Sequence, residues 1–324
     1  MSSKTNIKIA IIRLSSLGDI IHSLWTLQFI KKQYPQSHIT WVCDKSFENL
    51  VKCCPQVDKI ISIPLREKKF NKSFKILKSI SKDNFDYVID MQGLLKSAIV
   101  SRIISSKVHG FCKKSSREKL ASFFYKYKYT IPYKKNIYLR NLDLINQSLK
   151  FTTKEEEIIN YSKYLISTEK VEKYCYLKNN NNKNIIFIPS ATTPERVIPI
   201  EKYIQIINLL DYNCYIIYGN NTELKKCQKI KDKCQNLVIL PKLSIAKLIS
   251  IFSYADCIIG PDTGPSNVPT AIKVPSITIY WDKARNSFKR NTLKTKINKS
   301  ITFKDFSNLN INAIIKLIYI VIKG

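Results

Sequence analysis

The segment Arg13-Leu14-Ser15-Ser16-Leu17-Gly18-Asp19-Ile20-Ile21-His22-Ser23 connects the first apolar run, residues 7–12, to the first amphipathic stretch, residues 20–34. The apolar run predicts a buried strand, and the helical spacing of apolar residues after it predicts a helix. Open parallel sheets bind ligands outside the carboxyl ends of their strands, so this segment is a candidate binding loop. A purely structural role is the alternative, because Ser16 or Asp19 can cap the helix start.

The rest of the sequence repeats this alternation of short apolar runs with helix-length stretches. Further strands of the first half are predicted at residues 39–43, 59–63, 87–91 and 108–111. After a polar transition over 151–184, strands are predicted at 185–189, 214–218, 237–240, 257–260 and 276–280, with helices from about 200 and over 223–234 and 245–252. Such alternation predicts an α/β fold with two doubly wound, Rossmann-like domains.

We place the domains at residues 1–165 and 166–310, followed by a C-terminal helix at 311–324. Packing of this helix on the N-terminal domain is one of its possible arrangements. The apolar part of that helix contains Lys316 and falls short of the roughly 20 residues that cross a bilayer. No signal peptide is predicted, because the first apolar run is short and is interrupted by Arg13.

The first loop does not fit two common nucleotide-binding patterns. It contains only Gly18, and the chain has 7 glycines in all. A pyrophosphate therefore cannot approach this turn as it does in G-x-G-x-x-G dehydrogenases, and the P-loop pattern is missing as well. We expect the nucleotide to bind in the second half.

Polar residues follow the predicted strands of that second half. Hydroxyl groups there can bind phosphate oxygens, an arginine can supply charge, and the amides of a helix start suit an anion. Each threonine taken singly could instead be a helix cap, but together the residues predict a diphosphate site. They are Thr192, Thr193, Arg196, Glu223, Asp262, Thr263 and Gly264.

The chain is strongly basic, with 54 Lys and Arg against 24 Asp and Glu, a formal net charge of +30. This charge suits nucleic acid or an anionic membrane surface, and a lysine-rich composition without specific purpose explains it equally. No helix-turn-helix, zinc-finger or RNA-binding signature accompanies the charge, so we favour an anionic lipid over nucleic acid. Two basic clusters lie in the first half: Arg66, Lys68, Lys69, Lys72, Lys75 and Lys78, and Lys113, Lys114, Arg117 and Lys119.

Nine cysteines occur without C-x-x-C spacing, which predicts neither a zinc site nor a disulfide framework. Free thiols in a reducing cytosol fit this pattern. His38 and His109 are too scattered to predict a metal site.

The opening segment resembles the N-terminal signature of the ADP-heptose:lipopolysaccharide heptosyltransferases, specifically of the type I group, which add the first heptose to Kdo-lipid A. Three further matches follow in the same order: Asp90-Met91-Gln92-Gly93-Leu94-Leu95-Lys96-Ser97, Ala191-Thr192-Thr193 and Asp262-Thr263-Gly264. The resemblance spans nearly the whole chain. It implies a GT-B fold, in which two Rossmann-like domains face a cleft.

The resemblance also implies inverting transfer of L-glycero-D-manno-heptose from ADP-heptose, without a metal or cofactor. Asp19 matches the family's catalytic base, and His22 is the alternative base on the same helix. Glu223 would accept hydrogen bonds from ribose hydroxyls. Implied acceptor-binding residues are Ser15, Ser16, Gly18, Arg66, Lys69, Gln92, Lys96 and Arg117.

Three positions depart from the family pattern. Arg196 stands in for a family lysine in a shortened segment, Asn267 replaces a histidine, and Trp281-Asp282-Lys283 replaces a Gly-Pro-Thr segment.

From the resemblance as a whole we predict an enzyme of lipopolysaccharide inner-core synthesis that lies in the cytoplasm, peripherally on the inner membrane. The alternatives are a heptosyltransferase acting on a later core heptose, a nucleic-acid-binding protein, or a non-catalytic protein of the membrane surface.

Overall fold

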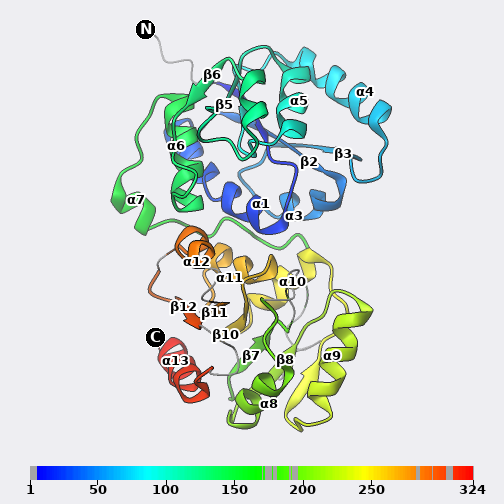
Figure 1. Ribbon diagram of the computed structural model, residues 1–324, viewed down its shortest axis with the longest axis vertical. Helices are drawn as coiled ribbons and strands as arrows, with labels where there is room; N and C mark the ends of the chain where they lie inside the picture. The colour runs from blue at the N-terminus through cyan, green and yellow to red at the C-terminus, as the bar shows by residue number, and fades with distance from the viewer. Residues whose placement is uncertain are drawn as a thin grey trace. The chain divides into compact units, whose positions relative to one another are not determined.

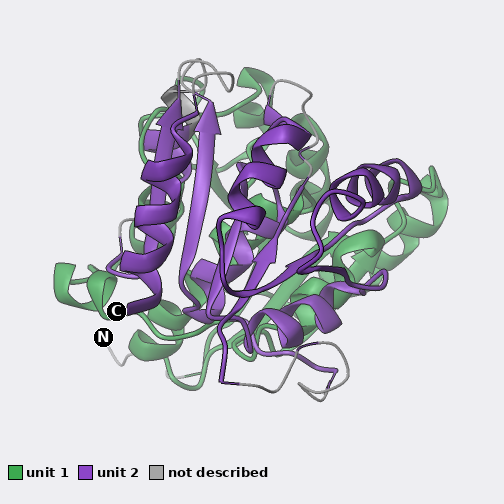
Figure 2. Cartoon of the chain, turned by 90° about the horizontal axis from the view of Figure 1, so that it is seen from below, with its two compact units in different colours: residues 1–164 green, residues 165–324 purple. Residues whose placement is uncertain are grey.

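A computed structural model shows two compact units, residues 1–164 and 165–324 (Figure 2). The structure describes residues 6–169, 171, 177, 181–189, 191, 196–281, 285–293, 295–303 and 309–323. Thr192 and Thr193, as well as Asp282 and Lys283, lie outside these ranges.

Unit 1 is built on a six-stranded parallel sheet with the order β3-β2-β1-β4-β5-β6. Its strands are β1 Lys8–Ile12, β2 His38–Asp44, β3 Lys59–Ile63, β4 Tyr87–Asp90, β5 Val108–Phe111 and β6 Tyr127–Tyr129. The order reverses between β1 and β4, where Ile12 lies opposite Asp90. Loops that follow these two strands therefore meet at the switch point where open α/β sheets bind ligands.

Helical connections flank this sheet (Figure 1). They are α1 Leu17–Leu24, α2 Leu27–Gln33, η1 Lys45–Phe47, α3 Glu48–Lys52, α4 Phe70–Ile80, η2 Ser81–Asp83, α5 Leu95–Ile104, η3 Lys119–Phe124, α6 Ile137–Leu149 and α7 Glu155–Ile159. Side chains of α4, α5 and η3 share one apolar core with Ala10, Ile12 and Val88 of the sheet. These three connections thus cover the same face.

Unit 2 repeats the strand order in a second six-stranded parallel sheet, β12-β11-β10-β7-β8-β9. Its strands are β7 Asn184–Phe187, β8 Asn213–Ile216, β9 Leu237–Ile239, β10 Cys257–Pro261, β11 Ser276–Trp281 and β12 Asn298–Phe303. The connections include α8 Ile200–Asn208, α9 Asn221–Lys231, α10 Ile245–Phe252, η6 Pro265–Asn267, α11 Val268–Ile272 and α12 Arg285–Asn291. The switch point here lies between β7 and β10, where an added Cβ on Gly260 would come within 2.6 Å of Ile188.

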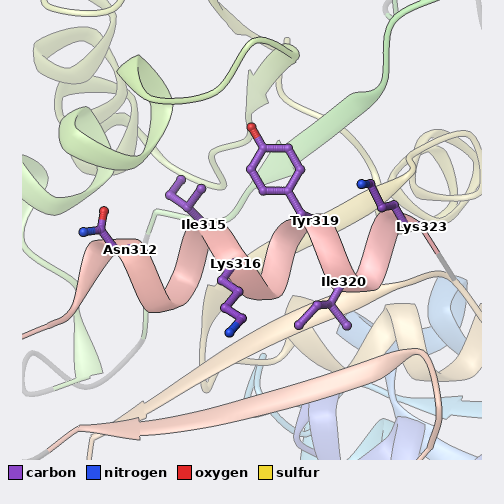
Figure 3. A pocket seen from close by; sticks show the side chains of 6 residues that line it. All are labelled: Asn312, Ile315, Lys316, Tyr319, Ile320 and Lys323. Atoms are coloured by element: carbon purple, nitrogen blue, oxygen red, sulfur yellow. The ribbon is translucent and has the colours of Figure 1, made fainter.

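The terminal helix α13, Ile311–Lys323, belongs to unit 2. Its buried residues Ile314, Ile318 and Val321 join the core formed by the second sheet and α8. The apolar stripe of α13 is thus covered within unit 2, and packing of this helix on the N-terminal domain stays a prediction. A surface pocket lies along its outer side, lined by Asn312, Ile315, Lys316, Tyr319, Ile320 and Lys323 (Figure 3).

The strands expected from apolar runs are present, with small shifts at their ends, but one edge strand of each sheet, β6 and β12, was not anticipated. β6 reads Tyr-Lys-Tyr and β12 contains Asn, Lys, Ser and Thr, so neither edge strand has an apolar run. The helix expected over 20–34 begins earlier, at Leu17, and divides into α1 and α2 at Trp25 and Thr26. Among the described helices, none combines the length and apolar character needed to cross a membrane.

Candidate functional site

Asp19 lies in the first turn of α1, directly after β1 and at the switch point of the first sheet. Its carboxylate accepts hydrogen bonds from the Ser16 amide at 3.3 Å and from the Ser16 hydroxyl at 3.0 Å. These bonds give it the capping role that the sequence allowed. The side chain still exposes 31% of its surface, so the carboxylate also remains accessible.

Arg13 forms an ion pair with this carboxylate, with 3.0 Å between its Nη2 and Oδ1 of Asp19. Burial raises the pKa of Asp19, but Arg13, His22 and the Ser16 hydrogen bonds together lower it by more than burial raises it. The resulting pKa is about 2, below the usual 3.8. Asp19 is therefore ionised throughout the physiological pH range.

Arg13 is itself held in place by the loop after β4. Only 6% of its side chain is exposed, and Nη1 donates to the Met91 carbonyl at 2.5 Å. The neighbouring Leu14 amide donates to Oε1 of Gln92 at 2.8 Å. The two loops at the switch point are thus joined by direct hydrogen bonds.

A buried carboxylate, Asp90, organises that second loop. It accepts from the Gln92 and Gly93 amides at 2.8 and 3.2 Å, and from the Ser97 and Tyr125 hydroxyls at 2.8 and 2.7 Å. Burial raises the pKa of Asp90, while these donors oppose the shift. Gly93 has a φ of +68°, and an added Cβ would meet the Phe111 ring at 3.3 Å. Glycine is therefore required at this turn.

The predicted acceptor residues divide into three groups. Ser15, Ser16 and Gln92 lie in the two joined loops beside Asp19, and Gly18 precedes Asp19 in the first turn of α1. Lys96 and Arg117 are exposed, and their loops meet because Glu118 accepts from the Leu95 amide at 2.6 Å and donates its own amide to the Gly93 carbonyl at 3.0 Å.

Arg66 and Lys69 lie farther along the sheet, after β3, and both have acidic neighbours. Nε of Arg66 is 4.0 Å from Asp44, and its guanidinium lies 4.6 Å from the Phe47 ring centre. Nζ of Lys69 contacts Glu67 at 2.6 Å. Part of their charge is therefore already balanced within the protein.

His22 lies on the same helix as Asp19 but is only 4% exposed. Its ring packs edge-on against Tyr138 of α6, with ring centres 4.7 Å apart. This burial disfavours His22 as a base that meets a substrate.

In unit 2, Arg196 and Asp262 bridge the switch point. Arg196 follows β7, Asp262 follows β10, and their side chains form an ion pair at 3.0 Å. Burial raises the pKa of Asp262, and Arg196 partly opposes this shift. Because 34% of the Arg196 side chain is exposed, its guanidinium can also reach a bound anion.

The turn after Asp262 corrects one expectation, a helix start with amides free for an anion. Pro265 has no N–H, while the Ser266 and Asn267 amides donate to the Thr263 and Gly264 carbonyls at 3.2 Å. Nδ2 of Asn267 donates to the same carbonyls at 3.0 and 3.3 Å. These donors are engaged within the turn, so the helix start offers an anion less than expected.

Glu223 lies in the first turn of α9, beside the end of β8. It accepts a hydrogen bond from the Gly219 amide at 2.7 Å, and Asn220 caps the helix through the Glu223 amide at 3.0 Å. Within the described ranges, no group of His, Cys, Asp and Glu side chains could hold a metal ion.

Sequence reasoning did not identify Arg13 or Asp90 as parts of the site. Arg13 opens the first motif and Asp90 opens the second, each at the end of a buried strand, so their positions were a usable signal. A charged residue so close to the end of a strand is either buried with a partner or exposed at the ligand-binding edge of the sheet. Only the tertiary structure shows the partners of Arg13 and Asp90.

Comparison with known proteins gives likenesses of three kinds: a family model, curated relatives and a solved structure. Residues 73–312 match the model of glycosyltransferase family 9 (heptosyltransferase). The chain is 36% identical to lipopolysaccharide heptosyltransferase 1 of Campylobacter coli over 93% of this chain and 91% of that protein, and 25% identical to the Escherichia coli K12 protein of the same name over 84% and 87%. The solved structure of E. coli heptosyltransferase WaaC with ADP superposes with a TM-score of 0.84 at 23% identity, covering 97% of this chain and 99% of that one. The predicted GT-B fold with two Rossmann-like domains is confirmed.

Proposed function

The chain belongs to glycosyltransferase family 9, the heptosyltransferases, and we propose that it transfers the heptose of ADP-heptose to the Kdo sugar of Kdo-lipid A with inversion. The resemblance noted in the sequence is confirmed at the level of the family, and heptose transfer in lipopolysaccharide core synthesis follows from it. Beyond the family, we propose the identity of the acceptor, the roles of individual residues and the mechanism.

The ion pair of Asp19 with Arg13 is the observation that carries the mechanism. A hydroxyl oxygen of Kdo attacks the anomeric carbon of the heptose, the bond from that carbon to the diphosphate oxygen breaks, and ADP leaves from the opposite face. Asp19 accepts the proton of the attacking hydroxyl. A carboxylate with a pKa of about 2 is a weak base, so it takes the proton late, when the new carbon–oxygen bond has made that hydroxyl strongly acidic.

Alignment is thus the main contribution of Asp19. Arg13 and Ser16 fix its carboxylate in one orientation, which favours a near-attack geometry for the acceptor hydroxyl. Arg13 also keeps Asp19 ionised, so every enzyme molecule is ready to accept the proton at neutral pH.

On the donor side, we assign the diphosphate to Arg196, and to Thr192, Thr193 and Thr263. Arg196 is exposed enough to leave Asp262 for the more highly charged diphosphate, where it would stabilise the negative charge of departing ADP. Glu223 is assigned to the ribose hydroxyls, because a carboxylate beside the diphosphate would be repelled. Solved WaaC structures with ADP and with ADP-2-deoxy-2-fluoro heptose support ADP-heptose as the donor.

Basic side chains of unit 1 are assigned to the anionic acceptor. Lys96 and Arg117 flank the loop that carries Gln92, and Arg66 and Lys69 lie after β3. They would bind the Kdo carboxylates and the lipid A phosphates. Such a substrate places the enzyme at the cytoplasmic face of the inner membrane, where the charge of +30 favours reversible attachment to anionic lipids.

The direct test incubates the protein with ADP-heptose and Kdo-lipid A, with and without EDTA, and determines the mass of the product. We expect addition of one heptose and equal rates with and without EDTA, because we assign no metal or cofactor to the site. A parallel reaction with an acceptor that already carries one heptose separates the first transfer from a later one. Transfer only to that second acceptor would overturn the assignment.

A further inference from the structure

Unit 1 exposes large apolar side chains on the helical layer that covers one face of its sheet, formed by α4, α5 and η3. α4, α5 and η3 cover the same face and share one core, to which they contribute Leu77, Val100 and Ala121 among others. Every exposed phenylalanine of the described ranges belongs to α4 or η3: Phe70 is 63%, Phe74 51% and Phe123 66% exposed. Exposed apolar groups gathered in this way mark an interaction surface.

Phe70 and Phe74 stand one turn apart on the same side of α4, at the spacing that brings helical side chains together. Leu77 and Ile80 anchor the helix to the core, so neither phenylalanine is needed for that packing. Phe70 also lines a surface hollow together with Lys68, Lys69, Asn71 and Lys72.

The segment around this pair is almost entirely basic. Glu67 is the single acidic residue between 66 and 82, and it contacts Lys69 at 2.6 Å. The basic residues of this segment are Arg66, Lys68, Lys69, Lys72, Lys75, Lys78 and Lys82. A helix that combines protruding apolar side chains with lysines is typical of segments that lie in a membrane interface.

The layer also reaches the end of the sheet where Asp19 lies. α4 and α5 begin after the carboxyl ends of β3 and β4, and they pack side by side (Figure 1). Phe70 is the first residue of α4, and Lys96 lies in the first turn of α5. A surface bound here would lie close to the loops assigned to the acceptor.

We propose that α4 inserts Phe70 and Phe74 into the boundary between headgroups and acyl chains of an anionic bilayer, with Phe123 as a second anchor. The surrounding lysines bind the lipid phosphates. A second copy of this chain is disfavoured as the occupant, because two such basic surfaces repel each other. The proposal deepens the proposed function, since it explains how the enzyme reaches a lipid acceptor.

The first experiment measures co-sedimentation of the full chain with phosphatidylcholine vesicles, with and without phosphatidylglycerol. The variant Phe70→Ser/Phe74→Ser should bind the anionic vesicles at least roughly tenfold more weakly. Ile159→Ser is the matched control, because Ile159 is 68% exposed but lies on α7, outside this layer. Equal binding of the wild type and the double variant would overturn the proposal.

A second experiment tests insertion itself. Phe70→Trp and Ile159→Trp are compared on anionic vesicles whose acyl chains carry bromine, which quenches tryptophan at the depth of the chains. Of the three native tryptophans, Trp25 and Trp41 are fully buried and Trp281 of β11 is half-buried, so the wild type is measured alongside to give the native quenching. We expect additional quenching only in Phe70→Trp. Absence of additional quenching in Phe70→Trp would contradict insertion. Displacement of the protein from the vesicles by single-stranded RNA, with loss of the additional quenching in Phe70→Trp, would contradict it as well.

Activity separates this inference from the proposed function. Heptose transfer is measured with Kdo-lipid A in vesicles and with a deacylated acceptor in solution. The double variant should lose at least roughly tenfold in rate on vesicles and keep the wild-type rate in solution. An inactive wild type that still inserts into vesicles would refute the proposed function alone, whereas an active wild type that does not need Phe70 and Phe74 would refute the inference alone.

Discussion

Arg13, directly after β1, and Asp19, in the first turn of α1, form an ion pair at 3.0 Å, and the two partners differ in exposure, 6% for the arginine side chain and 31% for the aspartate. The buried partner is fixed by the loop after β4, through the Met91 carbonyl. The exposed partner is therefore a carboxylate of fixed charge and orientation at the ligand-binding end of the sheet. This relationship gives the proposed base its properties and leads to the first three predictions.

Asp19→Asn should lower the rate of heptose transfer by more than about 100-fold, because the amide cannot accept the proton. ADP affinity and the circular dichroism spectrum should stay close to wild type. Asp143→Asn is the matched control, since Asp143 is also ion-paired and is 30% exposed. Retention of most activity in Asp19→Asn would remove Asp19 as the base and return attention to His22.

Arg13→Met should shift the pH dependence of transfer. Without the guanidinium, burial raises the pKa of Asp19 without its main opposing charge, so the acid limb of the rate profile should move to higher pH. Arg13→Lys keeps the charge and should restore much of the wild-type profile. A profile that is unchanged in Arg13→Met would show that Arg13 does not control the ionisation of Asp19.

The same ion pair predicts a pH dependence of stability. The pKa of Asp19 falls from 3.8 to about 2 on folding, so the stabilisation is fully present above pH 4 and is lost as the pH falls toward 2. The difference in Tm between the wild type and Asp19→Asn should therefore shrink over that range. A constant difference would mean that the charge of Asp19 does not stabilise the fold.

Arg196→Ala should weaken ADP binding by roughly 1.5–3 kcal/mol, the range for a hydrogen bond to a charged group. Isothermal titration calorimetry with ADP measures this directly. Asp262→Asn serves as the comparison variant. It removes the acidic partner of the Arg196 guanidinium and should therefore preserve or strengthen ADP binding. Unchanged affinity in Arg196→Ala would show that another basic residue, with Lys283 the next candidate, holds the diphosphate.

Reversal of charge in Lys69→Glu/Arg117→Glu should raise the KM for Kdo-lipid A and leave ADP affinity unchanged. The effect should shrink at high salt, since exposed charges are screened. Lys225→Glu/Lys229→Glu on α9 is a control that makes the same change of net charge in unit 2. Normal use of the acceptor by the first variant would place the acceptor site elsewhere.

The sequence by itself determined the class of fold and the strand ends at which ligand-binding residues are expected. Buried parallel strands are nearly continuous apolar runs, so β1 and β10 could be recognised without a structure, and the residues after them stay candidates for the site. The edge strands β6 and β12 escaped recognition because their sequences are largely polar. Their pairing partners, rather than their own composition, make them strands.

Only the tertiary structure decided which charges meet. Asp90 lies opposite Ile12 because β4 pairs with β1 across a long connection, and this pairing brings the Met91 carbonyl to Arg13. Asp262 and Arg196 are likewise joined by the pairing of β10 with β7. The energy of a charge pair depends on separation and burial, and both are set by strand order, which local patterns do not encode. The sequence therefore located the polar residues of the site, and the fold determined their partners, their exposure and the pKa of Asp19.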